Sequence, residues 1–240
     1  MVEAFLWGAL GASALLVGAL IAYLLTPRRA VIAIVMALGT GVLIGSVSFE
    51  LVEEALKTAT VAQTALLVVV GAGAFTLGDW ILAHGGGSDR KDPQGAQAEG
   101  SPLAIVLGSV LDGIPESFVL GLTVLLGEVS LPLLAGIVLS NLPEGISSSS
   151  GLRIAGWPRN RVVVMWVAVM LVSAISAAAG YALLDPQSGR TGSLVQAFAA
   201  GALLAMLADT LLPEAYAVEG LWTGPLVVTG FAASIALSAL

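Results

Sequence analysis

The sequence predicts an all-α membrane protein with eight transmembrane helices in a 3+2+3 inverted-repeat arrangement. Three observations carry this prediction: the composition, the spacing of the apolar runs and two internal matches. Of the 240 residues, 58% are hydrophobic and 10% are charged, whereas a soluble domain carries about 25% charged residues. The chain has no cysteine and a net charge of −7, which excludes disulfides and thiolate metal sites and argues against nucleic-acid binding.

Eight apolar runs are long enough to cross a bilayer, which takes about 20 residues. They cover residues 4–25, 31–56, 61–84, 102–126, 131–152, 160–184, 191–217 and 221–240. Glu3 precedes the first run in place of a basic segment, so we expect a membrane span there and not a cleaved signal peptide. The Gly-rich stretch at 85–101 is predicted to be a flexible cytoplasmic loop within one transmembrane domain covering residues 1–240.

The distribution of basic residues predicts the orientation. Seven of the nine Lys and Arg residues lie in the loops after the first, third and fifth runs, and only Lys57 and Arg190 lie on the other side. The positive-inside rule therefore places these three loops in the cytoplasm and both termini outside. We expect a multi-pass protein of the plasma membrane, the inner membrane of a prokaryotic cell.

Two pairs of segments match at constant offsets. "GVLIGSVSFELVEEA" (41–55) aligns with "GALLAMLADTLLPEA" (201–215) at an offset of 160 residues. In the middle of the chain, Pro115 and Glu116 match Pro143 and Glu144 at an offset of 28. Each match relates spans that run in opposite directions, which is typical of an inverted repeat about an axis in the membrane plane.

Carboxylates lie deep within the fourth and fifth runs. Asp112 and Glu116 are four residues apart and share a helix face, as do Ser140 and Glu144, with Asn141 close to them. An isolated ionised carboxylate at this depth costs at least ~2.5 kcal/mol. No Lys or Arg lies in the interior of a run. Two explanations stay open: either the carboxylates are protonated, or a cation supplies the missing charge.

Prolines accompany both carboxylate sets. Pro115 and Pro143 have no N–H, so we expect broken helices in which the carbonyls of Leu111 and Leu139 are freed. Carboxylate, amide, hydroxyl and carbonyl oxygens together suit a divalent metal ion. The structural alternative is that these groups only link helices, and the repetition of the motif at one depth favours a site.

Further acids lie toward the ends of the runs. Glu50 and Glu54 are near the outer end of the second run, and Asp209 is near the inner end of the seventh. We expect them to relay cations at the two mouths of a pathway. Glu53 and His84, the only histidine, are interpreted as wetted interfacial residues.

These features together resemble the ZIP (Zrt/Irt-like protein) family of divalent metal transporters, with this chain as a divergent prokaryotic-type member. The resemblance rests on the eight runs, the polar loop, the paired Pro-Glu motifs and "AFAAGALLAMLADTLLPEA" (197–215). It implies metal ligands at Asp112, Gly113 and Glu116 on the fourth span. On the fifth span it implies Ser140, Asn141 and Glu144.

The sequence departs from the family pattern at three positions. Asp112 replaces the usual His, Gly113 replaces the usual Asn, and Ala177 stands where many relatives have a bridging Glu. Exchanging imidazole for carboxylate favours harder ions. We therefore expect manganese or ferrous iron to compete with zinc or cadmium as the transported ion.

The predicted function is transport of a divalent cation through a midplane site, with the metal as substrate and no prosthetic group or catalytic residue. The predicted partners are the cation and the lipid bilayer, and homodimerisation is left open. One alternative is a non-transporting metal sensor or scaffold. Another is an intramembrane metal-dependent enzyme, which the absence of an HExxH motif disfavours.

Overall fold

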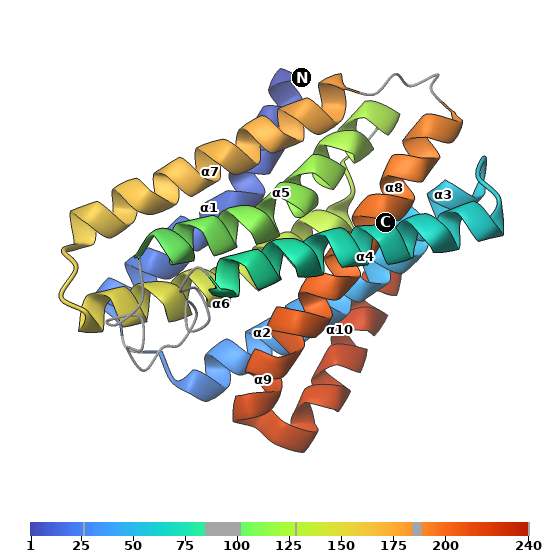
Figure 1. The fold of residues 1–240 in the computed structure, drawn as a ribbon. Helices are drawn as coiled ribbons and strands as arrows, with labels where there is room; N and C mark the ends of the chain where they lie inside the picture. The colour runs from blue at the N-terminus through green and yellow to red at the C-terminus, as the bar shows by residue number, and fades with distance from the viewer. Residues whose placement is uncertain (26, 85–101, 128, 184–188, 240) are drawn as a thin grey trace.

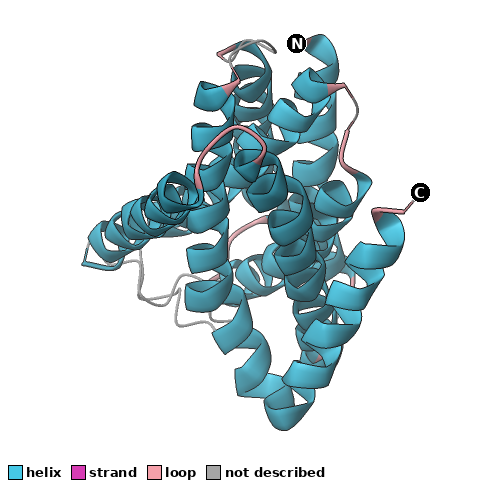
Figure 2. Cartoon of the chain, turned by 90° about the vertical axis from the view of Figure 1, so that its right-hand side faces the viewer, coloured by secondary structure: helices cyan, strands magenta, loops and turns pink. Residues whose placement is uncertain are grey.

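The computed structural model describes residues 1–25, 27–84, 102–127, 129–183 and 189–239, which form helices and no strands (Figures 1 and 2). The predicted loop at 85–101 lies outside this part of the chain. The longer helices are α1 (Val2–Leu24), α2 (Arg29–Ser46), α4 (Val61–Leu82), α5 (Pro102–Leu126), α6 (Leu131–Ile154), α7 (Arg159–Ala182), α8 (Arg190–Met206) and α10 (Thr223–Leu237). The shorter ones are η1 (Val47–Val52), α3 (Glu53–Leu56), η4 (Leu207–Leu211), α9 (Leu212–Glu219) and η5 (Gly220–Trp222).

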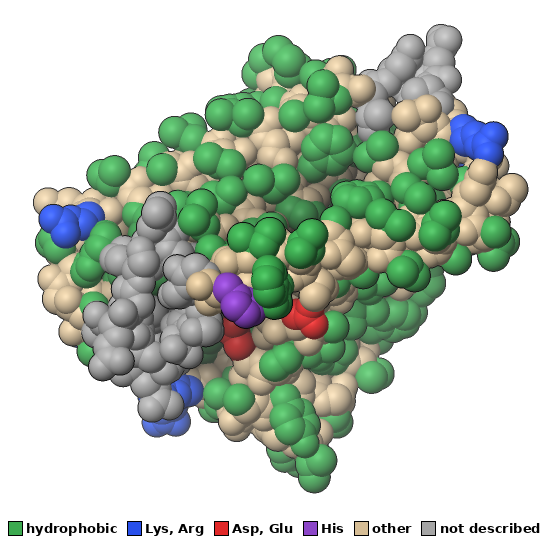
Figure 3. Space-filling model, in the orientation of Figure 1, with side chains coloured by type: hydrophobic (Ala, Val, Ile, Leu, Met, Phe, Trp, Pro, Cys, Tyr) green, Lys and Arg blue, Asp and Glu red, His purple; other side chains and the backbone are tan. Residues whose placement is uncertain are grey.

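Six helical stretches of the described chain are long and apolar enough to cross a membrane: Val2–Leu24, Arg29–Leu56, Val61–Leu82, Ile105–Leu126, Arg159–Ala182 and Arg190–Leu237. Apolar side chains are spread over the whole visible face (Figure 3), and the exposed ones include Leu66, Val69 and Trp80 on α4. These features indicate a helical membrane protein. These six stretches do not include α6, and they take Arg190–Leu237 as one stretch although the positive φ of Gly220 interrupts it. Six stretches of this kind therefore do not show the eight predicted spans.

The helices pack as two bundles. The first bundle contains α1, α5, α6 and α7, with α1 against α6 and α7, and α5 against α7. Its core includes Leu15, Leu152 and Trp166. The second bundle contains α2–η1–α3, α4, α8–η4–α9 and α10, with α4 against α8 and α2 against α10. The bundles meet mainly where α2 packs on α6, while α5 and α8 touch over a smaller area.

Glycines bring the paired helices of the second bundle into backbone contact. A methyl group on Gly201 of α8 would overlap the carbonyl oxygen of Val68, and one on Gly71 of α4 would overlap that of Phe198. The other pair repeats this arrangement, with Gly41 against Val227 and Gly230 against Leu38. Small residues of this kind allow close helix approach in membranes, where lipid is as apolar as the side chains.

The two halves of the second bundle repeat each other at the offset found in the sequence. Gly41 and Gly201 are 160 residues apart, as are the carbonyl-bearing Leu38 and Phe198. The π-helical turns η1 and η4 also begin 160 residues apart, at Val47 and Leu207. The correspondence therefore extends from residue identity to backbone contact and helix type.

The expectation of broken helices at the prolines is wrong. Both α5 and α6 continue as α-helices through Pro115 and Pro143. Each proline removes one backbone hydrogen bond, and the remaining bonds and the tight packing of neighbouring helices maintain the helix. The carboxylates consequently project from two continuous helices, which fixes their spacing along each axis.

Two glycines of α4 provide a test of the close packing. Gly71→Ala places a methyl group against the Phe198 backbone and should lower the melting temperature in detergent, by the ~1–3 kcal/mol typical of overpacking. Gly73 has open space around it, so Gly73→Ala should leave stability unchanged or raise it by up to ~1 kcal/mol. Equal melting temperatures for the two variants would contradict this account.

Candidate functional site

Three carboxylates line one gap between the bundles, which we term the central gap. Asp112 and Glu116 reach it from α5, Glu144 and Ser140 from α6, and Met206, Thr210 and Leu211 from α8–η4. The first four residues belong to the first bundle and the last three to the second. The spacing of four residues on α5 and again on α6 is what turns these side chains to a common face.

The carboxylates are almost completely buried. Asp112, Glu116 and Glu144 are 4%, 2% and 5% exposed. Ser109 of α5 donates a hydrogen bond to Glu144 Oε1 at 2.7 Å, across to the other helix. The Ser140 hydroxyl lies 3.4 Å from Glu116 Oε1 and 3.0 Å from the Ile137 carbonyl oxygen, its other acceptor. Each glutamate is thus contacted by a hydroxyl from the neighbouring helix.

The central gap is closed in this conformation. The space between its side chains is too narrow for a water molecule. Among the described residues, no three Asp, Glu, His or Cys side chains are close enough together to hold a metal ion as they stand. A cation that binds here must therefore draw the three carboxylates inward, with Ser140 and Thr210 as neighbouring oxygen donors.

Asn141 lies apart from this group. Its side-chain nitrogen donates to the carbonyl oxygen of Gly11 on α1 at 3.3 Å, and the residue is 6% exposed. Asn141 is not among the residues that line the central gap. The structure therefore gives Asn141 a contact between α6 and α1 within the first bundle.

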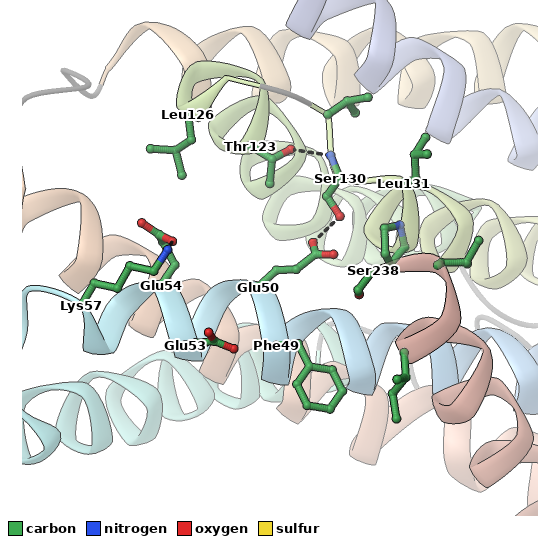
Figure 4. Close-up of a pocket in the computed structure, with 14 residues that line it drawn as sticks. Phe49, Glu50, Glu53, Glu54, Lys57, Thr123, Leu126, Ser130, Leu131 and Ser238 are labelled. Atoms are coloured by element: carbon green, nitrogen blue, oxygen red, sulfur yellow. Dashed lines mark hydrogen bonds and ion pairs between the residues drawn. The ribbon is translucent and has the colours of Figure 1, made fainter. Parts of the chain in front are cut away.

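A second, wider cavity of about 890 Å³ lies at the end of the bundles where α5 passes into α6 (Figure 4). We term it the end pocket. Glu50, Glu53 and Glu54 line one side, and Thr123 and Ser130 line the other. The end pocket holds two residues predicted for a cation pathway, Glu50 and Glu54, away from the central carboxylates.

Ser130 links the two walls of the end pocket. It is the N-cap of α6, where its hydroxyl oxygen accepts a hydrogen bond from Leu133 N at 3.0 Å. The same hydroxyl donates to Glu50 Oε2 of η1. Thr123 Oγ1 accepts from Ser130 N at 3.2 Å, which fixes the turn after α5. One side chain thus caps a helix of the first bundle and contacts the second.

Glu54 pairs with the nearby Lys57 on the exposed rim. The hydrogen bond and the charge of Glu54 raise the pKa of the Lys57 ammonium group. Exposed pairs of this type contribute little to stability. Their effect is on the local charge, because Lys57 offsets one of the three acids of the end pocket.

Asp209 and His84 lie apart from the central gap. Asp209 Oδ2 accepts a hydrogen bond from Thr76 Oγ1 of α4 at 3.3 Å. The exposed His84 ring lies 4.2 Å from the Trp80 ring, centroid to centroid, with Nδ1 2.8 Å from the Trp80 carbonyl oxygen. His84 therefore has the surface position that the sequence predicts.

Sequence reasoning missed three residues near the central carboxylates: Ser109, Met206 and Thr210. Ser109 precedes Asp112 by three residues, a helical spacing that could have revealed it. Thr210 follows Asp209 directly, and its uncharged side chain has no feature in the sequence that separates it from a helix-packing threonine. Met206 has no feature in the sequence that separates it from a core methionine.

Comparison with known proteins adds nothing to these observations: no protein-family model matches the chain, and no curated protein sequence matches it. The function must therefore be argued from the residues themselves.

The double role of Ser130 can be tested by substitution. Ser130→Ala removes both the cap of α6 and the bond to Glu50, whereas Thr60→Ala removes only the cap of α4. Loss of a cap costs ~0.5–2 kcal/mol, so Ser130→Ala should lower the free energy of unfolding by more than Thr60→Ala. Denaturation in detergent measures both values, and a smaller loss for Ser130→Ala would show that the Glu50 contact stabilises nothing.

Proposed function

We propose that this protein transports a divalent cation across the plasma membrane through a site formed at the central gap. The observation that carries the proposal is the convergence of Glu116 and Glu144, from matching Pro-Glu motifs, with Asp112 on one buried gap. Carboxylates at this depth are rare in membrane helices and are usually functional.

Charge supports a cation as the ligand. Three carboxylates share a small volume, and no Lys or Arg lies in the interior of a membrane run of the sequence. Like charges at short range disfavour ionisation unless a proton or cation lies between them. A divalent ion neutralises two of the three charges and accepts oxygen ligands from Ser140 as well. Manganese, ferrous iron, zinc and cadmium are the candidate ions.

The fold proposed for this function has eight spans in a 3+2+3 inverted repeat, with both termini outside. It is supported by the paired glycine contacts and the π-helical turns, which recur at an offset near 160 residues. The first and second bundles supply two bodies that can move relative to each other. Inverted repeats of this kind alternate access to a midplane site, and the Pro-Glu motifs resemble those of the ZIP family.

The end pocket serves in this proposal as the outer mouth. Its acids, Glu50, Glu53 and Glu54, concentrate cations near the membrane surface. Asp209 takes the corresponding place toward the inner mouth. Ser130 and Glu50 connect the bundles at the outer side, so opening a path from the mouth to the central gap requires this contact to separate.

Removal of one central carboxylate should weaken cation binding. Glu144→Gln keeps the side-chain shape and removes a charge, so we expect the affinity for Mn²⁺ or Cd²⁺ to fall by at least about tenfold. Glu53→Gln, on the exposed wall of the end pocket, is the matched control and should lose far less. Isothermal titration calorimetry on purified protein measures both, and equal losses would mean that the central carboxylates are structural.

Acid should weaken binding to the unchanged protein, because protons compete with the cation for the same oxygens. The affinity should therefore fall between neutral pH and about pH 5.5, approaching the range in which free carboxylates take up protons. Cation flux into proteoliposomes completes the test. Binding without flux would favour the metal-sensor alternative, and affinity unchanged by acid would contradict a carboxylate site.

A further inference from the structure

Thr210 brings an oxygen atom of the second bundle to the carboxylates of the first. It lies in the π-helical turn η4, is 8% exposed and lines the central gap with Asp112, Glu116 and Glu144. The other residues that η4 and α8 contribute to the gap, Met206 and Leu211, carry apolar side chains. Thr210 is therefore the polar group on this wall of the gap.

The hydrogen bond that the Thr210 hydroxyl makes determines how its oxygen can interact with a ligand. Its hydroxyl donates to the carbonyl oxygen of Met206, one turn earlier, at 2.6 Å. A threonine hydroxyl has one proton and two lone pairs. With the proton engaged within its own helix, Oγ1 can present only lone pairs elsewhere. It cannot donate to the carboxylates, and lone pairs beside carboxylates are favourable only when a proton or a cation lies between them.

The π-helical turn gives this position a counterpart. Glu50 lies 160 residues before Thr210, in the matching turn η1. Both turns thus carry an oxygen-bearing side chain at the equivalent place, one facing the central gap and the other the end pocket. Single π-helical turns within α-helices occur frequently at functional sites.

We propose that Thr210 Oγ1 is a further ligand for the transported cation, supplied by the second bundle to carboxylates held by the first. The bound cation then bridges the two bundles, so its arrival and departure change the contact between them. This inference rests on the proposed function of the central gap. It adds an uncharged ligand to the site and assigns that ligand to the second bundle.

Substitution at Thr210 has a matched control within the chain. Thr210→Val keeps the shape and removes the oxygen, so Mn²⁺ affinity should fall by about tenfold, as for loss of a metal-site partner, while Thr210→Ser should keep it. Thr40 of α2 is likewise a buried threonine and donates to the carbonyl oxygen one turn earlier, at 2.8 Å, but lies outside the central gap. Thr40→Val should therefore leave the affinity unchanged.

A second variant replaces the Thr210 oxygen with sulfur instead of removing it. The chain has no cysteine, so Thr210→Cys introduces a single thiol. Sulfur prefers softer ions, and the ratio of Cd²⁺ to Mn²⁺ affinity should rise by about tenfold or more relative to Thr40→Cys. Calorimetry with each ion measures the ratio, and melting temperatures without metal confirm that the variants fold.

The outcomes distinguish a failure of Thr210 as a ligand from a failure of the proposed central cation site. If Glu144→Gln loses affinity while Thr210→Val matches Thr40→Val and Thr210→Cys leaves the ion ratio unchanged, Thr210 is not a ligand and the central site stands. If Glu144→Gln keeps its affinity, the central site itself is wrong. Loss in Thr210→Val with a raised ratio in Thr210→Cys supports Thr210 as a ligand.

Discussion

The burial of three carboxylates between α5 and α6 is the constraint on which the rest of the structure depends. Asp112, Glu116 and Glu144 are removed from solvent, and the interiors of the membrane runs contain no Lys or Arg to balance them. The surrounding helices meet this constraint with hydroxyl groups. Ser109 and Ser140 contact the glutamates from opposite helices, and Thr210 closes the gap from the second bundle. The hydroxyl groups that meet the carboxylates are thus grouped where the bundles face each other.

Close contact between helix backbones holds the rest of the structure together. In lipid, apolar side chains gain little by leaving the bilayer, so helices associate through close contact of their backbones. Gly41, Gly71, Gly201 and Gly230 supply such contacts within the second bundle. Between the bundles, Gly39 of α2 brings its backbone against Leu139 of α6. The contact of α5 with α8 is slighter, which leaves the central gap at the more loosely joined part of the interface.

Much of this architecture could be predicted because its signals are local or repeated. Helix length and hydrophobicity indicate the helices, and the spacing of four residues indicates that Asp112 and Glu116 share a face. The tertiary contacts could not be predicted in this way. Asn141 has the same spacing signal as its neighbours, yet it contacts α1, because a rotation of 100° per residue turns it from the face of Ser140. The continuity of α5 and α6 through their prolines also depends on packing that no local pattern contains.

The glycine contacts join helices that are far apart in the chain. Gly41 of α2 packs on α10, and Gly71 of α4 packs on α8, so two helices from the first part of the chain pack on two from the last part. During synthesis, α2 leaves the ribosome long before its partner exists, and its glycine face remains without that partner until α10 is inserted. The second bundle cannot close until residue 230 has been made. Assembly of the second bundle therefore requires the synthesis of α10, and a chain that stops before α10 lacks the partner for its own second helix.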